Sequence, residues 1–485
     1  MIALGSFLPD APAMGQHATV ANNCVPYIDY YGPFFAPVAY TSASSEAALG
    51  AFATKASTGL PYNFIGGASK LQKITSAALE DVSRVGGYAT ASELRWDFTT
   101  FGNRVIATNY SDAPQSYVMG SSTDFADLAG TPPKAKCVAT VRGFVMFGNT
   151  ITASNQLHWS ALENAEDYVY SSTNQSDTQL LYGESDVGQI QRIVGGEYAT
   201  IFMEKGIFRG TYVGLPYVFQ FDQIVRRTGT LAGGSVASYG EMIFFLGNDG
   251  FYMLSPAGLI PIGEGSVNRS FFREVESSDY WRISAIVDPK NSLYVVAYPT
   301  VAGALQKVMI YNWLAKKWTT VTPGNMECLF NFYSESMTAD SAAALALIGD
   351  PDTGDYASVS ADSALFIGGK PSLAGVSTAH IPVIFDGAAL TATVETAEAQ
   401  LTPGHKTLVK SVTPMVEGEG TIQVQIGYRN TVQEAVTYTD AATVGSEGEA
   451  YLFNTARYQR GRLTLSGGFQ RAYGLDYVGT RAGKY

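Results

Sequence analysis

Apolar and polar residues alternate along this chain in a unit that recurs several times. Each unit has a short apolar strand, a turn rich in Gly, Asn or Asp, and a second strand that carries aromatic residues. Alternation with a period of two indicates a strand with one buried face, so each unit predicts a β-hairpin. The units begin at Ala51, Arg104, Phe144, Ala199, Met242, Ser292 and Leu345. Their starts lie about 49 residues apart on average, which is the length of a four-stranded propeller blade.

The residues that follow each hairpin support this prediction. A polar turn and a further strand-like segment come next, as in the stretch where Trp313 and Trp318 flank the turn 314–317. Water can solvate the charges of such a turn while both indole rings pack between adjacent sheets. We therefore predict a β-propeller of six or seven blades over residues 51–369. Two or three separate β-sandwiches are the alternative, which would give short strands without even spacing.

The pattern changes at Pro371, where the alternating runs become longer and Gly-rich turns separate them. About seven strands in residues 370–485 predict an antiparallel β domain that resembles a small sandwich. We expect one of these strands to end at Ser466, because two glycines follow it. Arg457, Arg460 and Arg462 on that strand are interpreted as part of a solvated or ion-paired sheet face, with a subunit contact as the alternative.

The first 50 residues show little periodicity and are rich in Ala, Pro and Tyr. We predict that residues 1–50 run extended along the propeller or against a neighbouring subunit, without needing regular structure of their own. The predicted fold class is therefore all-β: an extended N-terminal segment, a six- or seven-bladed propeller and a C-terminal antiparallel, sandwich-like domain.

Composition narrows the class of protein. Charged residues make up 15% of the 485 residues while Gly, Tyr and Phe are abundant, which argues against coiled coils, helical bundles and disorder. The formal net charge is −12, and basic residues gather only in short runs such as the pair Arg226-Arg227. We therefore do not expect a dedicated nucleic-acid-binding surface. No apolar run reaches the roughly 18 residues of a membrane span. The N-terminal run is broken by Gly5 and Pro9, so we expect a soluble chain without a signal peptide.

Cysteine and histidine offer little chemistry. The three cysteines are odd in number and far apart, so we predict reduced, buried thiols instead of disulfides or a zinc site; they are Cys24, Cys137 and Cys328. The four histidines are dispersed over different units and are interpreted as structural; they are His17, His158, His380 and His405.

Two acidic stretches deserve a test against known sites. The stretch 350–355 resembles a calcium loop, but Asp355 replaces the glycine at its sixth position and Ala361 the glutamate at its twelfth, so an acidic hairpin tip is predicted. Glu163, Glu166 and Asp167 raise a glycosidase hypothesis, yet carboxylates on one turn usually form its solvated side and no opposing partner is evident. Phosphate-loop, zinc-protease and nucleophile-elbow motifs do not occur. We predict no catalytic residue, no cofactor and no metal site, and hence no enzyme.

Several blocks of this sequence resemble structural proteins from the tail modules of short-tailed bacteriophages. The similar blocks are residues 8–10, 96–109, 124–135, 144–149, 193–198, 201–209 and 457–462. The resemblance implies a tail nozzle, in which a homohexameric ring of propeller-bearing subunits continues the portal and adaptor and forms the DNA exit channel. It also implies docking surface for tail fibres or spikes, a place in the virion tail after assembly in the host cytoplasm, and no catalytic residues to carry over.

The expected function is thus a structural virion protein that conducts duplex DNA during ejection without binding it tightly, since an acidic wall repels phosphate. A receptor-binding or glycan-degrading virion propeller is the alternative, and a cellular propeller scaffold is the third hypothesis. Copy number separates the first two, because six copies in an axial ring favour the nozzle and peripheral trimers favour the second.

Overall fold

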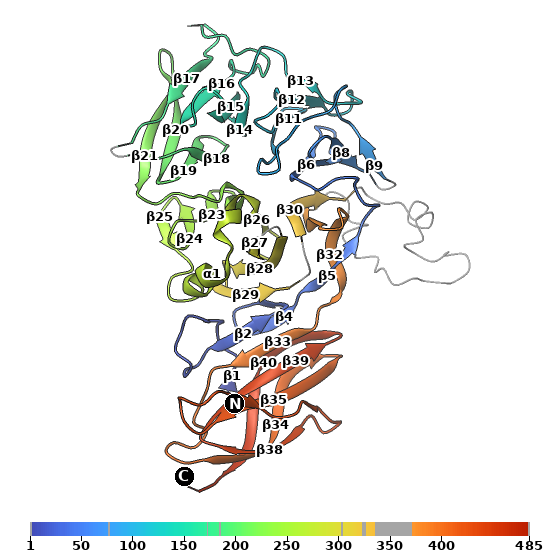
Figure 1. The fold of residues 1–485 in the computed structure, drawn as a ribbon, viewed down its shortest axis with the longest axis vertical. Coiled ribbons are helices and arrows are strands. Elements are labelled where there is room, and N and C mark those ends of the chain that lie inside the picture. The colour runs from blue at the N-terminus through green and yellow to red at the C-terminus, as the bar shows by residue number, and fades with distance from the viewer. Residues whose placement is uncertain are drawn as a thin grey trace, which may run out of the picture.

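A computed structural model of the chain describes residues 2–75, 78–171, 173–183, 186–301, 304–322, 326–334 and 371–483. Within these residues, five four-stranded sheets and two four-stranded parts of a 14-stranded sheet stand side by side around a common axis (Figure 1). The innermost strands of neighbouring units contact one another in sequence order, except that β18 (Ile190–Val194) contacts the short helix η1 (Gly233–Ser235) before the fifth unit, and the last innermost strand contacts the first. The chain is therefore a closed seven-bladed β-propeller, and the predicted fold class is confirmed.

The blades are numbered in chain order. Blade 1 consists of β6 (Gly50–Lys55), β7 (Pro61–Gly66), β8 (Leu71–Ile74) and β9 (Leu79–Asp81). Blade 2 consists of β10 (Asp97–Phe101), β11 (Arg104–Thr108), β12 (Gln115–Val118) and β13 (Ala126–Asp127). Blade 3 consists of β14 (Ala135–Val141), β15 (Phe144–Thr150), β16 (Gln156–Trp159) and β17 (Asp177–Leu180). Blade 4 consists of β18 (Ile190–Val194), β19 (Ala199–Met203), β20 (Gly206–Gly214) and β21 (Val218–Arg226).

Blades 5 and 6 are connected by the helical turns of the propeller. Blade 5 consists of β22 (Ala237–Tyr239), β23 (Met242–Leu246), β24 (Phe251–Ser255) and β25 (Gly258–Pro261). Blade 6 consists of β26 (Ser284–Asp288), β27 (Leu293–Val301), β28 (Ala304–Asn312) and β29 (Lys317–Val321). The helix α1 (Asn268–Glu274) and the 3₁₀ helix η2 (Ser277–Arg282) lie between these blades, and η1 (Gly233–Ser235) precedes blade 5.

Blade 7 is assembled from both ends of the propeller sequence. Its first three strands are β30 (Met326–Tyr333), β31 (Pro371–Ser377) and β32 (Pro382–Ala389), and its outermost strand is β5 (Phe35–Ala39) from the N-terminal segment. β5 pairs antiparallel with β32, so a strand made before blade 1 completes the blade made last. Closure of this kind removes a free edge that would otherwise template aggregation.

The structure changes two predictions of the domain organisation. The propeller runs to Ala389 instead of residue 369, because β31 and β32 pair with β30 as strands of blade 7. Residues 1–50, for which we predicted an extended course along the propeller or a neighbouring subunit, contain five short strands, because backbone groups of β1, β2 and β5 pair with strands near the C-terminus. Six of the seven predicted hairpins coincide with adjacent strands of blades 1 to 6. The unit at Leu345 and the acidic stretch 350–355 lie outside the described residues.

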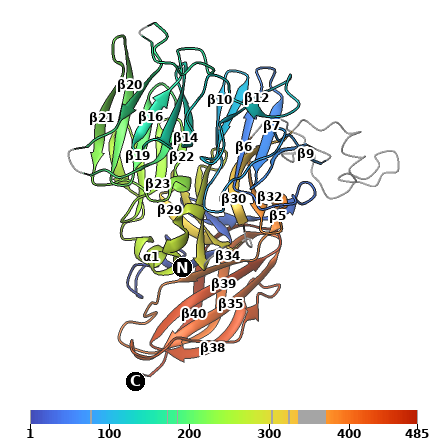
Figure 2. The ribbon, with the colours of Figure 1, turned by 45° about the horizontal axis from the view of Figure 1, so that its top comes forward.

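The C-terminal part forms a two-sheet sandwich beside blades 5 and 6 (Figures 1 and 2). One sheet has the order β3-β4-β40-β34-β38, with β1 also on β40, and the other runs from β35 through β39 and β33 to β2. Its C-terminal strands are β33 (Ala392–Thr396), β34 (Thr407–Gly418), β35 (Thr421–Arg429), β36 (Thr437–Tyr438), β37 (Ala442–Thr443), β38 (Ala450–Ala456), β39 (Tyr458–Ser466) and β40 (Phe469–Arg481). Its N-terminal strands are β1 (Ile2–Ala3), β2 (Ala18–Asn22), β3 (Cys24–Pro26) and β4 (Tyr31–Pro33). β39 ends at Ser466, as predicted.

The propeller and the sandwich share one continuous framework. β2 pairs with β33 of the sandwich on one side and with β29, the outermost strand of blade 6, on the other. A single hydrophobic cluster extends from blades 5 and 6 into the sandwich. Trp318 lies in this cluster between blades 5 and 6, where its ring centroid is 4.9 Å from that of Phe251, so the predicted packing of that indole between sheets is confirmed.

Candidate functional site: the central cavity of the propeller

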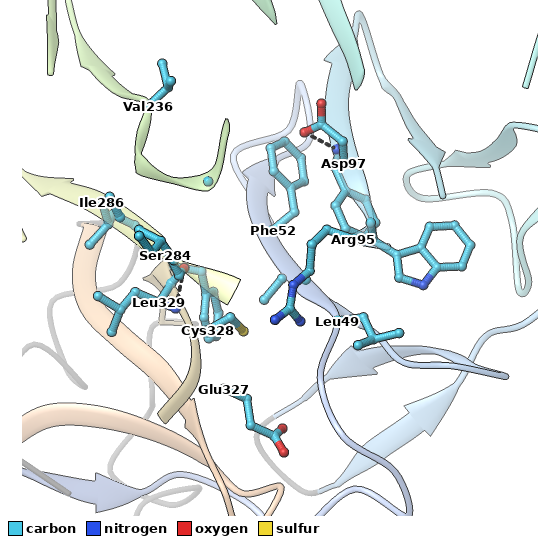
Figure 3. A pocket seen from close by; sticks show the side chains of 18 of the residues that line it. Leu49, Phe52, Arg95, Asp97, Val236, Ser284, Ile286, Glu327, Cys328 and Leu329 are labelled. Atoms are coloured by element: carbon cyan, nitrogen blue, oxygen red, sulfur yellow. Dashed lines mark hydrogen bonds between the residues drawn. The ribbon is translucent and has the colours of Figure 1, made fainter. Parts of the chain in front are cut away.

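The inner strands enclose a cavity of about 280 Å³ on the propeller axis (Figure 3). Segments from six of the blades contribute to its walls. Apolar side chains such as Phe52, Ile286 and Leu329 form much of the wall. Charged side chains lie near the starts of the inner strands β10, β26 and β30, and a further one, Arg192, lies on β18. The cavity therefore has a charged mouth and an apolar wall.

Arg95 reaches into the cavity from the segment that precedes β10 (Figure 3). The next residue, Trp96, is buried and its Nε1 donates a hydrogen bond of 2.8 Å to the carbonyl of Gly67. Gly66 permits this packing, because a Cβ at that position would lie 2.4 Å from Cδ1 of Trp96. Adjacent residues of an extended chain face opposite sides, so anchoring Trp96 in the core directs Arg95 to the axis.

Two guanidinium groups share one indole ring at the mouth. The guanidinium carbon of Arg95 lies 4.9 Å from the ring centroid of Trp281, and that of Arg282 lies 4.2 Å from it. Arg95 donates from Nε to the carbonyl of Trp281 at 3.4 Å and from Nη1 to the carbonyl of Ala48 at 3.2 Å. Burial lowers the pKa of the Arg95 guanidinium to about 10, and the nearby charge of Arg282 acts in the same direction.

Asp97 braces three blades at the cavity wall. It begins β10 of blade 2, accepts a hydrogen bond of 3.0 Å from the backbone N–H of Val138 in blade 3, and forms an ion pair of 2.8 Å with Arg192 of blade 4. Burial raises the pKa of Asp97, against the opposing effect of Arg192. The ion pair between Asp97 and Arg192 thus braces the structure, and it gives Arg192, the third arginine that lines the cavity, a counterion.

Glu327 forms the acidic side of the mouth. Its Oε2 accepts a hydrogen bond of 2.7 Å from the backbone N–H of Ala48, and its Oε1 lies 2.7 Å from Nδ1 of His380. Burial raises the pKa of this carboxyl group. The carboxylate is therefore occupied by His380 and a backbone group, and neither recorded hydrogen bond of Arg95 goes to it.

The other residues considered in the sequence occupy separate structural positions. The three cysteines are free and buried, as predicted, and burial raises the pKa of the Cys24 and Cys328 thiols to about 12. Burial lowers the pKa of His17 and of His158, which lie in different parts of the fold. His405 contacts Arg481 in the sandwich, and His380 pairs with Glu327 at the propeller mouth.

The carboxylates of the glycosidase hypothesis lie in the turn after β16. Glu166 pairs with Arg104 of blade 2, and Oδ2 of Asp167 accepts a hydrogen bond of 2.9 Å from the amide of Asn174. Glu163 adopts a positive φ of 56°, and its backbone N–H bonds the carbonyl of Gly143 at 2.7 Å. These contacts assign all three residues to the architecture of the turn.

Arg460 and Arg462 of β39 form an ion-paired sheet face, which confirms the interpretation for these two, whereas Arg457 precedes the strand and its buried Nε has no hydrogen-bond partner within the described residues. Arg460 lies 2.9 Å from Oε1 of Glu395, and Arg462 lies 2.6 Å from Oε2 of the same carboxylate. The hydroxyl of Tyr438 donates to this carboxylate at 3.0 Å. Glu395 is buried and stands on β33 next to β2, so the cluster secures the seam between the N-terminal segment and the sandwich.

The sequence analysis did not identify Arg95, Arg282 or Glu327. The local signal for the two arginines is an arginine adjacent to a tryptophan just before an inner strand. That signal cannot show that segments almost two hundred residues apart converge on one axis. Among the described residues, no group of three or more His, Cys, Asp or Glu side chains could hold a metal ion. Nor does that part of the chain contain a helix long and apolar enough to cross a membrane.

Comparisons with known proteins return similarity in structure alone. No protein-family model matches the sequence, and no curated protein matches it. Among solved structures, BBS1N in its complex with ARL6DN aligns with a TM-score of 0.39 and 11% identity, over 74% of this chain and 97% of that one. The WD40 domain of Pan2 from Neurospora crassa aligns with a TM-score of 0.39 and 9% identity, over 74% of this chain and 96% of that one.

Proposed function

We propose that this β-propeller protein is a structural subunit of a homohexameric ring, the tail nozzle of a short-tailed bacteriophage. In the virion tail it continues the portal and adaptor, offers surface to fibres or spikes, and conducts duplex DNA without gripping it. The observation that carries the proposal is that both chain ends lock the propeller and the sandwich into one framework with exposed apolar surface at its two ends.

The positions of the blocks that carry the resemblance support a structural role. Asp97, in the block 96–109, braces blades 2, 3 and 4. Asp10, in the block 8–10, accepts hydrogen bonds of 2.7 and 2.8 Å from the backbone N–H groups of Arg269 and Ser270 in the first turn of α1. Arg460 and Arg462, in the block 457–462, pair with buried Glu395. These blocks thus coincide with contacts that hold distant segments together.

The size of the axial cavity indicates where DNA would pass. The major groove of a duplex alone is about 12 Å wide, whereas the cavity of one propeller measures about 280 Å³ and side chains line it closely. A conduit for duplex DNA therefore requires several copies around a shared axis outside the individual propellers. The net charge of −12 on each copy favours repulsion of the phosphate backbone over retention.

Two exposed apolar patches favour the proposal that each subunit contacts one neighbour on each of two sides. We define the hairpin patch as Val169, Tyr170, Val213, Leu215 and Tyr217, on adjoining loops that a hydrogen bond of 2.9 Å from Tyr212 to Gln175 links. We define the sandwich patch as Tyr451, Phe453 and Val478, on β38 and β40. They lie toward opposite ends of the long axis (Figure 1). A head-to-tail ring needs two different patches on each subunit.

Imaging and mass measurement of the purified full chain test the proposal. We expect particles of six copies in a ring around an open axis, and no measurable binding of duplex DNA at physiological salt. Trimers would favour a receptor-binding role, and a monomer at high concentration would overturn the ring. Micromolar DNA binding that weakens steeply with salt would overturn the conduit.

Matched variants connect the ring to the patches. The double variant Tyr451→Ser, Phe453→Ser should reduce ring formation while the urea midpoint of the chain stays unchanged, because surface substitutions rarely alter stability by more than about 0.5 kcal/mol. Val85→Ser is the control, since Val85 is fully exposed and belongs to neither patch. Equal loss of rings in both variants would show that the sandwich patch is not an interface.

A further inference from the structure

The mouth of the central cavity holds two guanidinium groups with incomplete hydrogen bonding. A guanidinium has five N–H donors, yet the hydrogen bonds recorded for Arg95 within the described residues go to two backbone carbonyls. The Nε of Arg282 is buried and has no hydrogen-bond partner in the same part of the chain, although Oδ2 of Asp279 lies 3.5 Å away. A buried charge without a hydrogen-bonded counterion is costly, because neutral oxygens replace its hydration only in part.

The nearby carboxylates meet this requirement only in part: Asp279 forms an ion pair of 3.5 Å with Nε of Arg282, whereas the hydrogen bonds of Arg95 described above go to backbone carbonyls. Glu327 is bound by Ala48 and His380, and Asp97 is bound by Arg192 and the backbone of Val138. Arg95 and Arg282 thus both line the cavity, and both guanidinium groups contact the indole ring of Trp281. A group that brings two acceptor oxygens into the mouth would complete both forks, as carboxylates do with arginine.

The surroundings of the pair restrict the type of anion. Beyond the arginines, the apolar parts of the cavity wall come from Phe52 on one side and from Ile286 and Leu329 on the other (Figure 3). A second cavity of about 270 Å³ is also lined by Arg95, Arg282 and Glu327, so the guanidinium groups stand between two hollows. A hydrated inorganic anion would leave the apolar wall exposed to water, whereas an anion with an apolar body would cover it.

We propose that Arg95 and Arg282 form a binding site for a small organic carboxylate, with the carboxylate in the guanidinium forks and an apolar body against Phe52 and Ile286. Trp281 holds the two cations side by side before the ligand arrives, which lowers the ordering cost of binding. The site lies within one propeller and does not depend on the proposed nozzle function, so the two can fail separately.

Calorimetric titration of the full chain with benzoate tests this site. Benzoate carries a carboxylate on a small apolar body, and we expect saturable binding at one site per chain. Benzyl alcohol has the same body without the charge, and inorganic phosphate has the charge without the body, so both should bind at least about tenfold more weakly. Phosphate binding as tight as benzoate binding would overturn the organic part of the proposal, and absence of benzoate binding would overturn the site.

Arginine variants assign the binding to the mouth. Arg95→Gln and Arg282→Gln should each weaken benzoate binding about tenfold or more, because each removes one charged fork. Arg142→Gln is the matched control, since Arg142 also stacks on an aromatic ring, that of Tyr212, and pairs with Glu197, but lies outside the cavity. Circular dichroism checks that each variant is folded. If Arg95→Gln does not fold, the result for Arg282→Gln decides the test. Undiminished binding by a folded Arg282→Gln variant would overturn the assignment.

Discussion

Replacing Trp318 by alanine should destabilise the propeller by roughly 3 to 5 kcal/mol, the range for truncating a large buried aromatic side chain. The indole is 1% exposed, and its ring centroid lies 4.9 Å from those of Phe251 and Tyr311. Its Nε1 also donates a hydrogen bond of 2.7 Å to the carbonyl of Ile262. Losing that donor leaves a buried acceptor unpaired, which accounts for about 1 to 3 kcal/mol of the expected loss.

Urea unfolding followed by far-ultraviolet circular dichroism measures this effect. The midpoint should fall while the slope with denaturant stays constant, which indicates a change in stability without a change in the surface exposed on unfolding. Trp318→Phe should recover part of the loss, because it restores ring contacts but not the hydrogen bond. Leu314→Ala is the control in the adjacent turn, where Leu314 is 69% exposed, and it should change stability by less than about 0.5 kcal/mol. A loss below about 1 kcal/mol for Trp318→Ala would refute packing between blades 5 and 6.

Further predictions address closure, buried charge and pH. Deleting residues 242–291, which removes three strands of blade 5 and the inner strand of blade 6, should give insoluble protein, and a soluble folded product in a sedimentation assay would contradict the closed ring. Glu395→Gln should cost about 3 to 5 kcal/mol in urea unfolding because it removes a buried carboxylate that two partly buried arginines share, whereas Glu417→Gln at an exposed pair should cost less than about 1 kcal/mol. The pKa of Asp127 lies below its ordinary value of 3.8, mainly because the side chain of Gln115 donates a hydrogen bond to the carboxylate. The ionised carboxylate therefore stabilises the fold above pH 3.8, and this stabilisation is lost as the pH falls through the lowered pKa. The difference in urea midpoint between the wild type and Asp127→Asn should therefore shrink in acid.

The repeat could be predicted because it rests on local patterning. Hairpins such as the one that begins at Phe144 contribute second and third strands to their blades, and β15 is buried along its whole length between neighbouring blades. That burial makes the apolar signal strong. The strands that make up blade 7 could not be predicted, because its outermost strand, β5, is separated from its partner β32 by more than three hundred residues.

The candidate site could not be predicted for a related reason. Arg95, Arg282 and Glu327 each lie near the start of a different inner strand, and only the circular arrangement of the blades brings them to one mouth. The pairing of Glu395 with Arg460 and Arg462 was closer to prediction, because the alternation of β39 showed that these two arginines share a face. The partner carboxylate on β33 had no such signal.

The origin of β5 at the start of the chain bears on how the protein is made. A ribosome delivers β5 first, but its partner β32 follows only after six blades have been synthesised, and β1 waits still longer for β40. Contacts this distant in sequence form late and slow folding, because the loop must close before they contribute stability. A nascent chain thus carries unpaired strands until β32 and β40 have been made, and a product truncated before them keeps those strands exposed. Native stability and resistance to proteolysis consequently report that β1 and β5 have found their partners, so the fold itself distinguishes copies that carry both sets of strands from copies that lack one.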